Sequence, residues 1–139
     1  MKYMIMLYAS QREYDEMAGK VPEGEAVWTA ADLAAMHAFM EKWNRELVES
    51  GEFVDANGLA APVHTRRFHS EGGVPVVTDG PYPETAEVLA GYTIVECDSF
   101  DRASEITARL AGCPAPAGAE GTAIADLRPI VDGRADLEA

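Results

Sequence analysis

The sequence predicts an α+β domain of the ferredoxin-like type, with two helices on one face of a mainly antiparallel sheet. The first observation is the order of the segments, which is strand, helix, strand, inserted hairpin, strand, helix, strand. The second is that residues 2–9, KYMIMLYA, carry apolar side chains on both faces of the predicted strand. A strand of this kind lies inside a sheet that is covered on both sides. Because the helices supply one cover, we expect a second copy of the chain to supply the other, in a homodimer formed through the strands that begin near Lys2, Gly91 and Thr122.

Length and charge limit the possible functions. The 139 residues fit one domain, predicted at 1–132, followed by a disordered tail at 133–139. The formal net charge of −13 disfavours direct binding to nucleic acid and to anionic membranes. Neither a membrane span nor a secretory segment is predicted. Since Cys97 and Cys113 form no CxxC pattern, we expect both to be reduced thiols in a cytoplasmic protein.

The first long helix has clear boundaries. Thr29 and Asp32 have the spacing of a capping box, and Gly51 suits a left-handed C-terminal position. Residues 11–28 before it are polar and predict a surface loop that can include one helical turn. His37 and Asn44 fall inside the apolar stripe of the helix, which is expected to cover the sheet. That stripe consists of Leu33, Met36, Met40, Trp43, Leu47 and Val48.

The remaining elements follow from alternating apolar residues and from turn and capping residues. They are a strand at 52–60, a hairpin near residues 64–78, a strand at 91–97, a helix that opens at Asp98 or Ser99, and a strand at 122–130. The hairpin turn is expected at Glu71, Gly72 and Gly73.

Residues 79–92, DGPYPETAEVLAGY, are rich in turn residues and separate two predicted strands. We call them the signature segment. The segment resembles the DGPF motif of the YCII-related family, whose consensus is similar to DGPFAETKEQLGGY. The matching positions are Asp79, Gly80, Pro81, Glu84, Thr85, Glu87, Leu89, Gly91 and Tyr92.

The resemblance implies a ferredoxin-like domain that forms a dimeric α+β barrel. DGPF members are often encoded beside, or fused to, extracytoplasmic-function sigma factors, and more distant members are suspected of catalysis through a histidine and aspartate pair. This chain departs from the motif at Tyr82, Ala86 and Ala90. Ala86 replaces a lysine, so a Schiff-base amine or a cationic anchor is lost at that position.

The signature segment supplies the candidate site residues. In a functional interpretation, Asp79 is a catalytic acid, base or orienting group, and Tyr82, Glu84 and Tyr92 bind a ligand. In a structural interpretation, Asp79 accepts backbone N–H bonds within a Gly-Pro turn. His37 is the candidate catalytic histidine, although a histidine at such a position is more often a hydrogen-bonded residue of a helix seam than a catalyst.

Metal and cofactor chemistry is not predicted. His64 and His69 are five positions apart and would point to opposite faces of a continuous strand. No phosphate-binding loop or dinucleotide fingerprint occurs, and Cys97 has no base near it in sequence. Two hypotheses remain. One is a small-ligand-binding or regulatory homodimer that works beside an extracytoplasmic-function sigma factor, and the other is a small-molecule enzyme without a redox cofactor that uses Asp79.

Overall fold

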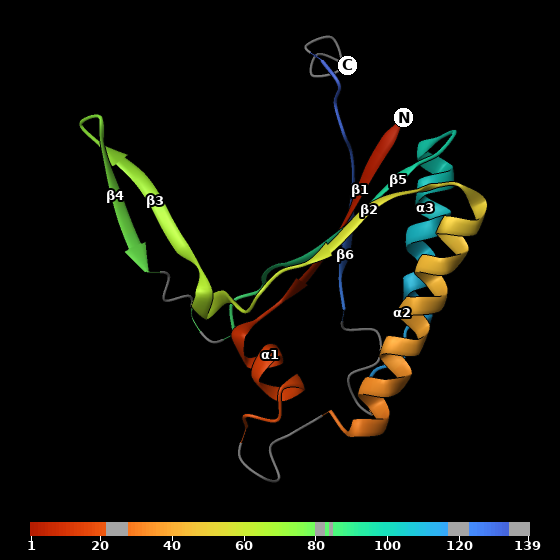
Figure 1. The fold of residues 1–139 in the computed structure, drawn as a ribbon, viewed down its shortest axis with the longest axis horizontal. Coiled ribbons are helices and arrows are strands. Elements are labelled where there is room, and N and C mark those ends of the chain that lie inside the picture. The colour runs from red at the N-terminus through yellow and green to blue at the C-terminus, as the bar shows by residue number, and fades with distance from the viewer. Residues whose placement is uncertain (22–27, 80–82, 84, 117–122, 134–139) are drawn as a thin grey trace.

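The structure is a computed structural model that describes residues 1–21, 28–79, 83, 85–116 and 123–133. It is an α+β domain, as predicted (Figure 1). The main sheet has four strands, and each pair of neighbours is antiparallel. Their order across the sheet is β2 (Phe53–Gly58), β5 (Val88–Glu96), β1 (Lys2–Ala9) and β6 (Ala125–Pro129). The last strand is therefore shorter than predicted, and Thr122 and the tail residues 134–139 lie outside the described ranges.

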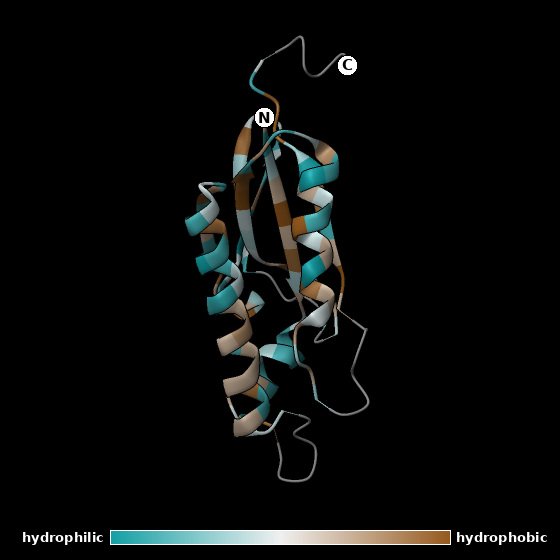
Figure 2. Ribbon diagram, turned by 90° about the vertical axis from the view of Figure 1, so that its right-hand side faces the viewer, coloured by the Kyte–Doolittle hydropathy of each residue, from teal (hydrophilic) through white to brown (hydrophobic). Residues whose placement is uncertain are grey.

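Two helices, α2 (Ala30–Ser50) and α3 (Phe100–Ala108), cover one face of this sheet, as predicted. Figure 2 views the molecule from that side, with the strands behind the two helices. The indole Nε1 of Trp43 on α2 donates a hydrogen bond of 3.1 Å to the carbonyl oxygen of Ile106 on α3, so the two helices are joined inside the core. The core cluster consists of Tyr3, Ile5, Trp43, Leu47, Val95, Cys97, Ala103 and Ile106.

The ends of α2 are those that the sequence predicts. The Thr29 side chain accepts a hydrogen bond from the Asp32 backbone N–H, and the Asp32 carboxylate accepts one from the Thr29 N–H, which completes a capping box. Gly51 ends the helix with φ of 78°, a left-handed conformation that glycine adopts at low cost.

The predicted apolar stripe of α2 is partly wrong. His37 and Val48 are exposed, whereas Phe39, which was not assigned to the stripe, packs against the core. At about 100° per residue, Phe39 lies on the Trp43 side of the stripe and His37 lies on the opposite side. The buried face of the helix is thus rotated away from His37. The prediction that this histidine lies within the buried stripe is wrong.

The prediction of a loop after the first strand is also wrong in part. Residues Gln11–Met17 form the helix α1, and the Ser10 side chain caps it by accepting a hydrogen bond from the Glu13 N–H. The Tyr14 hydroxyl donates to the carbonyl oxygen of Leu59 at 2.7 Å and lies 3.4 Å from that of Ala90. This helix is therefore bound to the residue that follows β2 and to the first part of β5, which belongs to the signature segment.

The predicted hairpin is present as a separate two-stranded sheet of β3 (Arg66–Glu71) and β4 (Val74–Asp79). We call residues 66–79 the arm. Gly72 and Gly73 form its turn with φ of 55° and 82°, values that favour glycine. The arm leaves the main sheet on the side opposite α2 and α3 (Figure 1). The described residues of one chain form two open sheets and no barrel, so the dimeric barrel that the resemblance implies would need two chains. No helix in the described ranges is both long and apolar enough to span a bilayer.

Candidate functional site

The face of the main sheet opposite the helices, which we call the open face, is the candidate site. Tyr3 and Ile5 of β1 point to the helices and are buried, so the alternation of a strand places Met4, Met6 and Tyr8 on the open face. The register pairs Met4 with Ile94 and Met6 with Tyr92 of β5. These five side chains are half-buried and form a central strip that is mainly apolar.

A polar cluster lies on the β2 side of this strip. Asn57 is paired with Tyr92 in the register, and its Nδ2 donates a hydrogen bond of 2.9 Å to the Tyr92 hydroxyl. The Tyr92 hydroxyl lies 3.4 Å from Oδ2 of Asp55, and Asn57 Nδ2 lies 3.3 Å from the same oxygen. Tyr92 was predicted to bind ligand, whereas Asp55 and Asn57 were missed. Their alternate positions in β2 place both on one face of the strand, which is the signal that could have identified them.

A second polar pair lies on the β6 side of the strip. The Tyr8 hydroxyl donates a hydrogen bond of 2.8 Å to Oδ2 of Asp126. This bond, together with desolvation and the negative charge of Asp126, raises the pKa of Tyr8, although Arg128 opposes the shift. Arg128 is paired with Met4 in the register and therefore lies on the same face. The open face thus has an apolar centre between two tyrosine–carboxylate pairs, an arrangement suited to hold a small molecule with apolar and polar parts.

The structure does not bring the predicted catalytic pair together in one chain. Asp79 is exposed at the end of β4, opposite Arg66 in the register of the arm. His37 is exposed on α2, and the arm and α2 lie on opposite sides of the sheet (Figure 1). Tyr82 and Glu84 lie outside the described residues.

The other two histidines are no nearer to a catalytic role. His64 is exposed in the short 3-10 helix Pro62–His64, and His69 Nε2 lies 3.0 Å from Oε1 of Glu71. Within the described ranges, no histidine is hydrogen-bonded to Asp79, and no group of three or more metal-binding side chains comes together.

A carboxylate pair at the other end of the signature segment was not predicted. Glu13 of α1 is partly buried, and desolvation raises the pKa of its carboxyl group. The negative charge of Glu87 raises this pKa further, while hydrogen bonds from Ser10 oppose the shift. The S-x-x-E spacing of Ser10 and Glu13, a helix-start pattern, was the signal that could have identified α1 and placed Glu13 on it.

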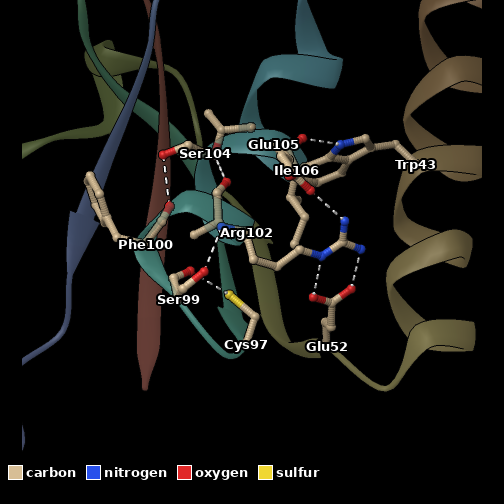
Figure 3. Close-up of polar contacts among 11 residues, drawn as sticks. Trp43, Glu52, Cys97, Ser99, Phe100, Arg102, Ser104, Glu105 and Ile106 are labelled. Carbon is tan, nitrogen blue, oxygen red and sulfur yellow. Dashed lines mark hydrogen bonds and ion pairs between the residues drawn. The ribbon is translucent and has the colours of Figure 1, made fainter.

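The cluster around Arg102 is structural (Figure 3). Arg102 of α3 binds both carboxylate oxygens of Glu52, with Nε–Oε2 and Nη2–Oε1 distances of 2.9 and 2.7 Å, and this ion pair lowers the pKa of Glu52. Cys97 Sγ donates a weak hydrogen bond to the Ser99 carbonyl oxygen, and burial raises the pKa of the thiol. Although a cleft of about 440 Å³ lies beside Cys97, a buried thiol with a raised pKa is a poor nucleophile.

Comparison with known proteins agrees with the resemblance of the signature segment. An uncharacterized protein of Rhizobium meliloti (strain 1021) is 26% identical over 98 residues, which are 70% of this chain and 74% of the relative. The family model of the YCII-related domain matches residues 1–128. This range includes the whole main sheet except Pro129, both covering helices, the arm and the signature segment. The chain therefore belongs to the YCII-related domain family.

Proposed function

We propose that this YCII-related protein is a ligand-binding homodimer of ferredoxin-like domains, with the ligand held on the open face beside Tyr92. The observation that supports this most strongly is the meeting of Tyr92, Asn57 and Asp55 on a sheet face without a helix cover. The strand order β2-β5-β1-β6, with antiparallel neighbours, agrees with a split βαβ topology. Closing the open face against a second copy would place the polar cluster at the interface.

The chemistry of the open face favours a small molecule with two kinds of surface. Met4, Met6 and Ile94 offer polarisable and aliphatic contact, and methionine side chains adapt to ligands of different shape. Tyr92, Asn57 and Asp55 offer hydrogen-bond donors and acceptors on one side, and Tyr8 with Asp126 offers them on the other. A ligand with an apolar body and hydrogen-bonding ends fits this pattern.

A thermal-shift screen of metabolite-sized compounds tests the proposal, because a ligand that binds only the folded state raises the melting temperature. A ligand present at 100 times its Kd stabilises the protein by about 2.7 kcal/mol. We expect Tyr92→Phe and Asp55→Asn to reduce the shift caused by such a ligand. Asp101→Asn, an exposed change on α3, is the matched control and should preserve it. A screen without any hit, or a shift that is equal in all variants, would contradict the open-face site.

We propose that this dimer regulates an extracytoplasmic-function sigma factor. The support is the resemblance of the signature segment to the DGPF motif, whose proteins are often encoded beside such factors. Co-purification with a sigma factor encoded next to its gene, and altered transcription from the promoters of that factor after deletion, are the expected results. Normal transcription together with no complex would count against this role.

The enzyme alternative is favoured by one specific observation. Desolvation and the negative charge of Glu87, in the signature segment, raise the pKa of the Glu13 carboxyl group. Carboxyl groups with a raised pKa are common among catalytic acids and bases. Mass spectrometry of each stabilising compound after incubation separates the two functions. Chemical change that is lost in Glu13→Gln or Asp79→Asn would establish an enzyme, and recovery of unchanged compound would support the binding protein.

A further inference from the structure

The arm has apolar side chains that its own chain leaves exposed. Its register pairs Phe68 with Val77 and Ser70 with Pro75, so Phe68, Val77 and Pro75 share one face of the hairpin. Phe68 is 65% exposed, and Val77 is 51% exposed. A two-stranded hairpin is at best marginally stable in water unless a third strand or another layer covers it. The arm therefore needs a cover to form a stable element.

The position of the arm indicates where that cover lies. The arm rises on the side of the sheet opposite α2 and α3, which is also the side of the open face (Figure 1). From the helix side, both helices lie in front of the strands (Figure 2). One side of the chain thus carries two surfaces without a helix cover. A symmetric pair of chains that join through this side would bring the arm of each copy to the sheet of the other.

Charge also favours a second copy as the occupant. The open face and the arm together carry four cations and five carboxylates, a formal charge of −1 in a chain of −13. Almost all of the negative charge lies elsewhere, and those surfaces of two copies repel each other. The nearly neutral side is where two acidic chains can approach closely, whereas a basic partner would be attracted to the other surfaces. The cations are Lys2, Arg66, Arg67 and Arg128, and the carboxylates are Asp55, Glu71, Asp79, Glu96 and Asp126.

We propose that the arm packs through Phe68, Pro75 and Val77 against the open face of a second copy, so that the partner's arm closes each ligand site. This inference rests on the homodimer of the proposed function and adds the element that completes its site. It also brings the end of β4, with Asp79, from one copy towards the Tyr92 cluster of the other. Asp79 would then contribute to a site that one chain cannot form alone.

Hydrogen exchange of the arm amides, measured over a range of protein concentrations, tests the inference. In the wild type we expect exchange of residues 66–79 to slow as the concentration rises. In Met6→Asp, which places a charge on the open face, we expect fast exchange at every concentration although the arm itself is unchanged.

Sedimentation provides a second test. Phe68→Asp should raise the dimer dissociation constant by roughly 100-fold, because each dimer loses two buried phenylalanine side chains. Val48→Asp on α2 starts from a side chain that is 60% exposed and is the matched control, which should leave the constant unchanged.

The outcomes distinguish a failure of the arm contact from a failure of the homodimer. A wild type that stays monomeric would overturn both proposals. A dimer that is weakened by Met6→Asp, but whose arm amides exchange equally fast at all concentrations, would overturn the arm contact alone. Protection of the arm that does not depend on concentration would also overturn it, because the cover would then lie within one chain.

Discussion

The two faces of the main sheet differ in what covers them, although the same strands build both. Towards the helices, Ile5 and Val95 are fully buried against residues such as Leu47 and Ile106. On the open face, Met6 and Tyr92 are only half-buried and lie beside polar groups. Alternate residues of β1 and β5 therefore have different roles: one set packs in the core, and the other lies on the open face. Substitutions on the helix side should change the stability of one chain, and those on the open side should change association and binding.

The largest stability effect is expected from Leu47→Ala on the helix side. Leu47 is 2% exposed, and removing its side chain leaves a cavity that costs about 2 to 5 kcal/mol of unfolding free energy. Its neighbour Val48 is 60% exposed, so Val48→Ala should change stability by about 0.5 kcal/mol or less. Urea denaturation of both variants measures the contrast. Equal losses would mean that the face of α2 is assigned wrongly.

A smaller loss is expected from Trp43→Phe. This change keeps an aromatic ring in the core but removes the hydrogen bond from Nε1 to the Ile106 carbonyl oxygen. The cost should be about 1 to 2 kcal/mol, from the lost bond and the change in packing. The same urea experiment measures it, and a stability equal to that of the wild type would show that the bond contributes nothing.

The ion pair between Glu52 and Arg102 should make stability depend on pH. The pKa of Glu52 is lowered in the folded state by Arg102, so its contribution is present above the ordinary value of 4.5 and is lost as the pH falls through the folded pKa. Glu52→Gln should lower the melting temperature by about 4 °C at neutral pH and by progressively less in acid. A difference between variant and wild type that stays constant down to about pH 3 would contradict the linkage.

Asp79→Asn should affect stability as little as Val48→Ala does, because the Asp79 side chain is exposed at the end of the arm. The change should alter the unfolding free energy by about 0.5 kcal/mol or less. A loss of about 1 to 2 kcal/mol, as in a broken cap, would instead support the structural interpretation in which Asp79 holds its turn. Calorimetry distinguishes the two values.

Features that local chemistry determines could be predicted from the sequence. Thr29 and Gly51 define the ends of α2, and Gly72 and Gly73 form the turn of the arm, because each needs only its own neighbours. The helix α1 was missed because its sequence is polar, and its position depends on the contact between Tyr14 and Leu59, 45 residues away. The exposure of His37 could not be predicted either. The apolar stripe of a helix shows roughly which side faces the core, but not which residues at the edge of the stripe contact the sheet.

The candidate site was harder to predict for the same reason. Tyr92 could be selected from the signature segment, but its partners come from another strand. Asn57 meets Tyr92 through the register of β2 and β5, and this register shifts at an irregularity between Phe53 and Asp55. A single shift of this kind changes which side chains share a face. The residues near Phe53 and Asp55 do not show, from sequence alone, where this shift in register occurs.

Sedimentation equilibrium of the wild type and of Met6→Asp, both at micromolar concentration, tests most directly whether the open face joins two copies. The wild type is expected to sediment at twice the mass of the chain, and Met6→Asp at the mass of a single folded chain. Circular dichroism confirms that the variant is folded. A wild type that sediments as one chain, or a Met6→Asp variant that stays a dimer, would contradict the assignment of the open face as the interface.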